Sequence, residues 1–257
     1  MSEKGRNWTK EETMLAFELY CIIPKGKDTE DNPQIVSLAK AINRSPGAVN
    51  FVLQNIKSCD PSYTADGKVG LKNASAVVKD VSREFLNNWD ALVVETKEIK
   101  KKLGLTEHDI SENEEHIIRV GRDRLITQKQ RIGQSFFRQA LLAANNYKCC
   151  FTGIDIPVLL RASHIKPWVE SNDINEKANP RNGLLLNALH DSAFDNGYIT
   201  ITTEYIILVS KKLLSDNDVN KRYFIPLNEK QMILPSRFLP DKQFIEYHNS
   251  KFKGLYA

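Results

Sequence analysis

The sequence predicts an α+β protein, with a helical N-terminal domain followed by a domain of short strands and helices. Residues 8–56 contain three helix-start signals, each followed by helical apolar spacing, and residues 147–202 alternate short apolar runs with one helix. An acidic segment at 104–121 separates the two patterns. The chain of 257 residues is 41% hydrophobic and 26% charged, which is typical of a globular protein and excludes a disordered one.

Each of the three N-terminal helices is predicted to begin at a capping residue. Thr9 and Glu12 have the spacing of a capping box. Asn32-Pro33 and Ser45-Pro46 each place a capping side chain before a proline at the first helical position. Because the turn between the second and third helices is short, the pair predicts a helix-turn-helix.

The outward side of the third helix, with the turn before it, carries side chains that can bond base edges or phosphates. The residues predicted to bind DNA here are Arg44, Asn50 and Gln54. The alternative is a small helical bundle with a solvated polar face. Residues 60–71 predict a wing or a loop, and residues 75–103 return to helical spacing.

The predicted domain boundaries follow from these patterns. Residues 1–103 form the helical domain, which is helix-turn-helix or winged-helix-like, residues 104–121 form the linker, and residues 122–257 form the second domain. The net charge of +4 is compatible with nucleic acid binding but does not establish it.

In the second domain, Val158–Ile165 is predicted to be a strand that carries His164 near its end. Pro167-Trp168 then breaks the strand, and Asn182-Gly183 is a turn signal before the apolar run 184–186. A helix over 187–194 would place Asn187, His190, Asp191 and Phe194 along one side. This helix would bring imidazole and carboxylate groups into one turn. Gly197 is predicted to end the helix, and residues 198–202 are predicted to form a strand after it.

Three short motifs in this domain resemble the HNH endonuclease family. They are Ser-His-Ile-Lys-Pro-Trp (163–168), Asn-Gly-Leu-Leu-Leu (182–186) and His-Asp-Ser-Ala-Phe-Asp-Asn-Gly (190–197). The resemblance covers about residues 131–252, and its tail at 244–248 is similar to the bacterial restriction-type subgroup. It implies a ββα-metal fold, in which two strands and a helix surround one metal ion. The N-terminal region lies outside the resemblance.

The resemblance also implies roles for individual residues. His164 would be the general base, Asn182 would orient it, and His190 would ligate the metal from the helix. Asp191 is the next metal ligand to be expected, and Ser163 stands where family members often carry a second ligand. Arg161 and Lys166 would contact the phosphate of bound DNA.

The cofactor implied by the resemblance is a divalent metal ion, Mg²⁺ or Mn²⁺. No structural zinc is expected, because Cys149 and Cys150 are neighbours rather than the CxxC pairs that bind it. The partner would be DNA, in bacterial restriction or phage defence, and duplex cleavage is compatible with a homodimer. A non-cleaving DNA-binding protein with a degenerate HNH fold and an RNA-directed nuclease are the alternatives. No apolar run is long enough to span a membrane and no export signal is seen, so a cytoplasmic location is expected.

Overall fold

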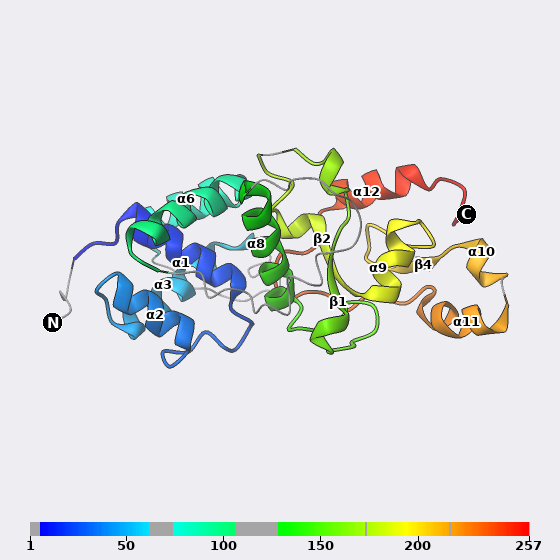
Figure 1. Ribbon diagram of the computed structural model, residues 1–257, viewed down its shortest axis with the longest axis horizontal. Coiled ribbons are helices and arrows are strands. Elements are labelled where there is room, and N and C mark those ends of the chain that lie inside the picture. The colour runs from blue at the N-terminus through cyan, green and yellow to red at the C-terminus, as the bar shows by residue number, and fades with distance from the viewer. Residues whose placement is uncertain (1–5, 62–73, 106–127, 173, 216, 257) are drawn as a thin grey trace. The chain divides into compact units, whose positions relative to one another are not determined.

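The computed structural model describes residues 6–61, 74–105, 128–172, 174–215 and 217–256, except the side chains of 128–131 (Figure 1). The chain divides into two compact units, residues 1–139 with 173–178, and residues 140–172 with 179–257. Helix α8, Gln128–Ala144, contributes to both units. The predicted linker lies almost wholly outside the described residues, so the predicted domain boundaries remain a prediction.

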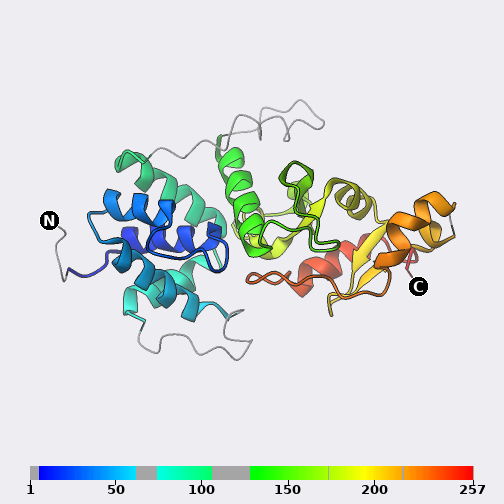
Figure 2. The same ribbon diagram turned by 90° about the horizontal axis from the view of Figure 1, so that it is seen from below.

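The first unit is helical, as the sequence predicted. Helix α1 lies among the other helices of this unit (Figure 2) and contacts α2, α3, α5 and α6. Buried apolar side chains of these helices form the core of the unit. Phe17 of α1 lies against the Trp89 ring at 6.0 Å between centroids, and both side chains are almost fully buried. The bounds are α1 (Lys10–Ile22), α2 (Pro33–Ala41), α3 (Pro46–Cys59), α5 (Ala76–Phe85) and α6 (Trp89–Lys102).

The three predicted helix starts are confirmed. The Thr9 hydroxyl accepts from the Glu12 amide while the Glu12 side chain accepts from the Thr9 amide, which completes the capping box. Asn32 and Ser45 accept from the first-turn amides of α2 and α3. In the turn between α2 and α3, Asn43 has a left-handed backbone with φ 53°, a conformation that asparagine tolerates.

The helical spacing over 75–103 belongs to two helices, because the chain breaks at Asn87 and Asn88, which have low helix propensity. The expected wing or loop at 60–71 falls mainly on residues outside the described part of the chain. Among the described residues, no helix has the length and apolar character needed to cross a bilayer.

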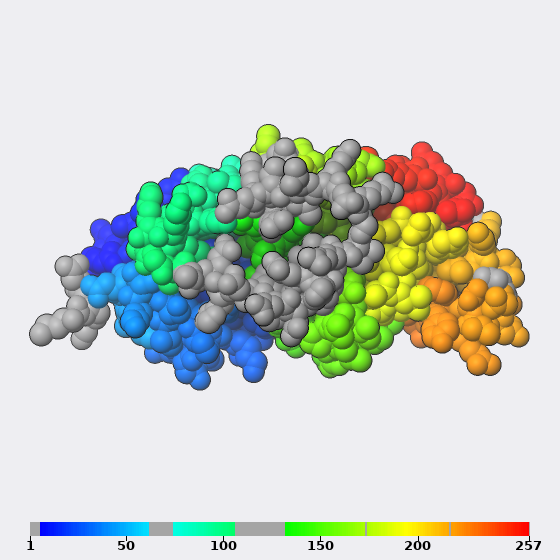
Figure 3. All heavy atoms as spheres, in the orientation of Figure 1, coloured from blue at the N-terminus to red at the C-terminus, as the bar shows by residue number. Residues whose placement is uncertain are grey.

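The second unit contains two antiparallel pairs of strands. Strand β1 (Leu160–His164) pairs with β2 (Gly183–Asn187), and β3 (Ile199–Ile201) pairs with β4 (Ile207–Val209). Helix α9 (Ala188–Asp195) contacts β1, β2 and β3. The chain continues through α10 (Lys211–Leu214), α11 (Asp218–Phe224) and α12 (Lys242–Lys251), and Figure 3 shows α10 and α11 in orange on the surface of this unit.

The first strand is shorter than predicted. Pro157–Leu159 forms a 3-10 turn, and pairing begins at Leu160 opposite Asn187, because proline fixes its own φ and lacks a ladder donor. The second strand has all five residues buried, which explains its continuous apolar run. Gly197 ends α9 as predicted, with φ +68°, and a Cβ there would meet the Phe252 ring at 2.2 Å.

Candidate active site

His164 is placed by the β1–β2 hairpin. The register sets His164 opposite Gly183 at the end of the ladder, and the Ile165 amide donates to the Asn182 carbonyl at 3.0 Å. The side chain is half-buried, and its ring meets Trp168 edge-on at 5.4 Å between centroids. The predicted base therefore sits at the point where a rigid strand gives way to a turn.

Asn182 holds that turn through its side chain. Its Oδ1 accepts from the Lys166 amide at 2.8 Å, while its Nδ2 donates to the Lys166 carbonyl and to Ser171 Oγ, each at 3.2 Å. The side chain is completely buried. The predicted role of Asn182 in orienting His164 remains a prediction, and the geometry shows how the two are connected through the Lys166 backbone.

Helix α9 brings two carboxylates beside Ser163, the residue before His164. Burial raises the pKa of Asp191, and interactions with Ser163 and Arg161 act in the opposite direction. Burial also raises the pKa of Asp195, to about 6, with a further increase from the Asp191 carboxylate. Asp191 and Asp195 are four residues apart on α9, so their side chains lie on the same side of the helix, and both interact with Ser163.

These groups fit a hard divalent cation that keeps several water ligands. The described residues contain no cluster of three or more histidine, cysteine or acidic side chains arranged around a metal position. Mg²⁺, however, is commonly bound by one or two carboxylates, with water and substrate phosphate in the remaining positions. The buried Ser163 Oγ, which has no regular hydrogen bond within the described structure, is a further oxygen beside the pair.

His190, the predicted metal ligand, lies in a different environment. It is 4% exposed, and its Nδ1 is 2.7 Å from Asn187 Nδ2. Its ring packs against Phe151 and Phe224, and its buried Nε2 has no partner among the described residues. The sequence analysis placed His190 and Asp191 on the same side of α9. In the structure, the His190 ring instead points into the interior, while Asp191 and Asp195 both lie beside Ser163.

Cys149 shares this interior environment. Asn187 Nδ2 is 3.7 Å from Cys149 Sγ and 3.3 Å from Thr152 Oγ1. Burial alone would raise the pKa of the Cys149 thiol, but interactions with His190 and Thr152 outweigh it and lower that pKa to about 7. Cys149 is itself fully buried, which suits packing rather than reaction with solutes.

The predicted phosphate contacts already have neighbours in the second unit. Arg161 Nη1 donates to the carbonyls of Val158 and Leu160 at 2.9 and 3.1 Å. Lys166 Nζ lies 5.2 Å from the centroid of the Tyr247 ring. Both side chains are half-buried, and their contact with DNA remains a prediction.

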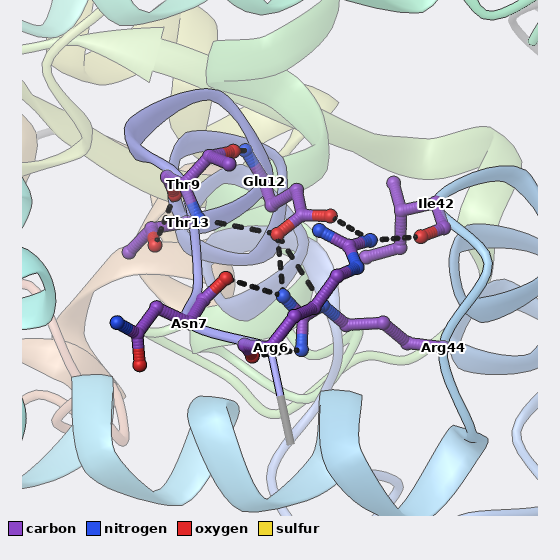
Figure 4. A network of polar contacts seen from close by, with 7 residues as sticks. All are labelled: Arg6, Asn7, Thr9, Glu12, Thr13, Ile42 and Arg44. Carbon is purple, nitrogen blue, oxygen red and sulfur yellow. Dashed lines mark hydrogen bonds and ion pairs between the residues drawn. The ribbon is translucent and has the colours of Figure 1, made fainter. Parts of the chain in front are cut away.

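In the first unit, Arg44 is part of a polar network (Figure 4). Its guanidinium bonds Glu12 Oε2 at 2.8 Å and the carbonyls of Arg6 and Asn7, and it lies 4.3 Å from the Trp8 ring centroid. Its side chain is only 7% exposed. This arrangement fixes the turn before α3 and leaves little of Arg44 for a ligand, a structural role that the sequence analysis did not anticipate.

The other two predicted DNA contacts lie on α3. Gln54 Nε2 donates to Asp28 at 2.7 Å and to Asn50 Oδ1 at 3.2 Å. Asp28 also pairs with Lys57, so an acidic group lies against this part of the helix. Sequence spacing had no means of revealing Asp28, because the loop that carries it precedes α2 rather than α3.

Sequence reasoning also missed a cluster at the turn after His164. Tyr247 and Lys251, from α12, both contact Glu170. The partners lie 77 and 81 residues apart in the chain, and no local pattern joins them.

Comparison with known proteins gives one family match. Residues 149–202 match a family model described as HNH endonuclease. The matched range contains β1, β2, α9 and β3, and with them all of the candidate residues of the second unit described above except those of α12. No curated protein matches the chain.

Proposed function

Since residues 149–202 match the HNH endonuclease family model, we propose that this chain is a metal-dependent endonuclease that hydrolyses DNA phosphodiester bonds. The observation that carries the proposal is the placement of His164 at the end of β1, next in sequence to a serine that lies beside the Asp191 and Asp195 carboxylates. A nuclease of this type needs a base and an anionic metal position close together.

His164 is proposed as the general base. A neutral imidazole takes a proton from water near physiological pH, and the half-buried ring is accessible for that role. Asn182 holds the Lys166 backbone on both its amide and its carbonyl, so the turn after His164 is fixed before substrate arrives. This preorganisation removes motion that would otherwise have to be lost during the reaction.

Asp191 and Asp195 would hold the divalent cation, Mg²⁺ or Mn²⁺, with Ser163 beside them. The bound cation supplies positive charge to the scissile phosphate and its leaving oxygen. His190 remains a proposed ligand from sequence, with the Asp191 and Asp195 pair better supported by geometry. Arg161 and Lys166 would contact the phosphate of the bound DNA.

The N-terminal unit is proposed to select the DNA through a helix-turn-helix formed by α2 and α3. The short turn and the capped start of α3 support that arrangement. Asn50 and Gln54 would face the bases, and Arg44 would support the turn. We further propose that the protein acts in the cytoplasm, in restriction or phage defence. It would act there as a homodimer.

Nicking of supercoiled plasmid in Mg²⁺, Mn²⁺ or EDTA tests the proposal. Wild type should nick in either metal and stop in EDTA, while His164→Ala should lose about 10²–10⁴-fold in rate, the usual contribution of a general base. Tyr223→Phe, an exposed tyrosine of α11 outside the proposed site, is the control and should retain activity.

Duplex DNA, single strands and RNA should be compared in the same assay. Cleavage of RNA alone would favour the RNA-directed alternative. Tight DNA binding without cleavage in any metal would favour the non-cleaving alternative.

A further inference from the structure

The turn that follows His164 is fastened to the C-terminal helix α12. Glu170 ends the 3-10 turn Trp168–Glu170, and its carboxylate accepts from the Tyr247 hydroxyl and from Lys251 Nζ. The hydrogen bond with Lys251, followed by that with Tyr247, lowers the pKa of Glu170, so the carboxylate stays charged at neutral pH. One face of the turn is thus held by two side chains one helical turn apart on α12.

The Tyr247 ring extends these contacts to the other side of the turn. The ammonium groups of Lys166 and Lys251 each lie 5.2 Å from its centroid, within the range of a cation–π contact. Lys166 is also the residue whose backbone Asn182 holds. Trp168, between Lys166 and Glu170, meets the His164 ring edge-on.

The next residue of α12 contacts the other catalytic element. The His248 ring stacks on Phe194 of α9, with 3.9 Å between centroids and 11° between planes. Its Nε2 donates to the Phe194 carbonyl at 3.1 Å, and its Nδ1 is 3.1 Å from Thr200 Oγ1. Phe194 precedes Asp195, so His248 satisfies a carbonyl at the end of the helix that carries the carboxylates.

Consecutive residues on a helix point about 100° apart, since an α-helix has 3.6 residues per turn. Tyr247 is therefore directed to the turn that carries His164, while His248 is directed to the helix that carries Asp191 and Asp195. We propose that α12 is a clamp that sets the separation of His164 from the Asp191 and Asp195 carboxylates, and that Tyr247 and His248 are its positioning residues.

The inference rests on the proposed nuclease function, and it assigns to Tyr247 and His248 no contact with substrate or metal. If these contacts served only to stabilise the fold, breaking them would lower the free energy of global unfolding. The side chains of Glu170 and Lys251 are each 34% exposed, and exposed ion pairs contribute little to global stability. The effect of breaking these contacts should instead fall on the local opening of the turn.

Tyr247→Phe tests the first arm of the clamp, because it removes the hydroxyl and retains the ring. Glu170→Gln removes the charge and retains the shape. Each change should lower kcat for plasmid nicking about three- to tenfold, since a hydrogen bond to a charged group is lost, and leave KM and Tm close to wild type. Hydrogen exchange over residues 164–171 should accelerate by a similar factor.

The two substitutions should also be coupled. Because both substitutions act on the contacts of one carboxylate, the loss in the double variant should be smaller than the sum of the two single losses. The exchanged pair Glu170→Lys with Lys251→Glu should recover part of the activity that Glu170→Lys alone loses. Tyr223→Phe is the matched control, because Tyr223 is an exposed tyrosine on α11 in the same unit.

His248→Gln tests the second arm. It should accelerate exchange over residues 193–198, at the end of α9, and weaken Mn²⁺ binding about three- to tenfold, while leaving exchange over 164–171 unchanged. Tyr247→Phe should show the reverse pattern in exchange. If His248→Gln does not fold, the variants of Tyr247 and Glu170 decide the proposal by themselves.

The clamp is refuted if Tyr247→Phe and Glu170→Gln match Tyr223→Phe in both kcat and exchange. It is also refuted if activity falls only in proportion to Tm, which is the pattern of a structural role. If wild type cleaves no nucleic acid, the proposed function fails, while exchange and Mn²⁺ affinity still decide whether α12 positions the two elements.

Discussion

Asn182→Ala is the substitution that the geometry of the second unit predicts most sharply. The side chain is completely buried, and its hydrogen bonds include one from the Lys166 amide, one to the Lys166 carbonyl and one to Ser171 Oγ. Alanine removes all three and leaves a space that the neighbouring 3-10 turn can only partly fill. The Lys166 amide then loses the acceptor that it has in the native turn.

The magnitude follows from those bonds. Each contributes about 0.5–1.5 kcal/mol net, and a buried donor left without an acceptor costs about 1–3 kcal/mol. Relaxation of the turn toward water offsets part of the sum, so we expect a loss of about 2–4 kcal/mol in the free energy of unfolding. For a unit of this size, the corresponding fall in Tm is about 5–15 °C.

Hydrogen exchange measures the effect at its source. The Lys166 amide should lose most of its protection in Asn182→Ala, and nicking activity should fall with it because the same turn carries His164. Asn182→Asp keeps an acceptor for that amide and should retain more protection. Asn196→Ala is the control, since it removes one exposed bond to the Ser192 carbonyl at 2.8 Å. Wild-type protection of the Lys166 amide in Asn182→Ala would refute the reasoning.

Three further predictions concern other parts of the chain. Arg44→Ala should destabilise the first unit by about 2–4 kcal/mol in urea unfolding, because it strips a partly buried carboxylate of a partner, whereas weaker DNA binding with unchanged stability would identify Arg44 as a DNA contact. Gly197→Ala should lower Tm by several degrees, because it strains a left-handed backbone and drives Cβ into the Phe252 ring; an unchanged melting curve would contradict this. For Asp195, the folded pKa of about 6 exceeds the ordinary 3.8, so the stability it contributes is present below about pH 4 and lost as pH rises through 6. Asp195→Asn in EDTA should therefore raise Tm at about pH 8, by only about 2–4 °C because part of the Asp195 side chain faces solvent, which screens its charge, and have no effect at about pH 4.

Much of the fold could be predicted from the sequence because its signals are local. A capping side chain and the amide that it satisfies lie within three residues, and the starts of α1, α2 and α3 were predicted from such pairs. The β1–β2 pair and α9 were predicted in the same way, from an apolar run, a turn signal and a glycine. The error at Val158 arose because apolar character alone does not distinguish a strand from the turn that precedes it.

The site was predicted less completely, because its contacts are not local. The motifs identified His164, Asn182 and Asp191, but they did not show that Ser163 lies beside the α9 carboxylates. No local sequence pattern identifies Glu170, because its partners Tyr247 and Lys251 belong to α12. In the same way, Gln54 was assigned to DNA from helical spacing, while its nearest partner is Asp28 of a preceding loop.

The neighbours of His190 lead to a last prediction, about which groups bind the metal. Asn187 Oδ1 accepts from the amides of Leu189 and His190, each at 3.1 Å, so its Nδ2 is the atom that faces His190 Nδ1. An amide nitrogen only donates, so beside a Cys149 thiol Nδ1 accepts and the proton of a neutral His190 ring is assigned to Nε2, whereas a Cys149 thiolate would instead accept an N–H of His190.

In that tautomer neither nitrogen of His190 offers a free lone pair to a cation. Binding through Nε2 would require that proton to leave or the bond with Asn187 to break, whereas the Asp191 and Asp195 carboxylates are free to bind a cation once they are deprotonated. Nitrogen NMR of the histidines should therefore show the Nε2–H form of His190, unchanged when Mg²⁺ is added. A Mg²⁺-induced change at His190 of the size expected for direct ligation would restore it as the metal ligand and move the carboxylate pair to a supporting role.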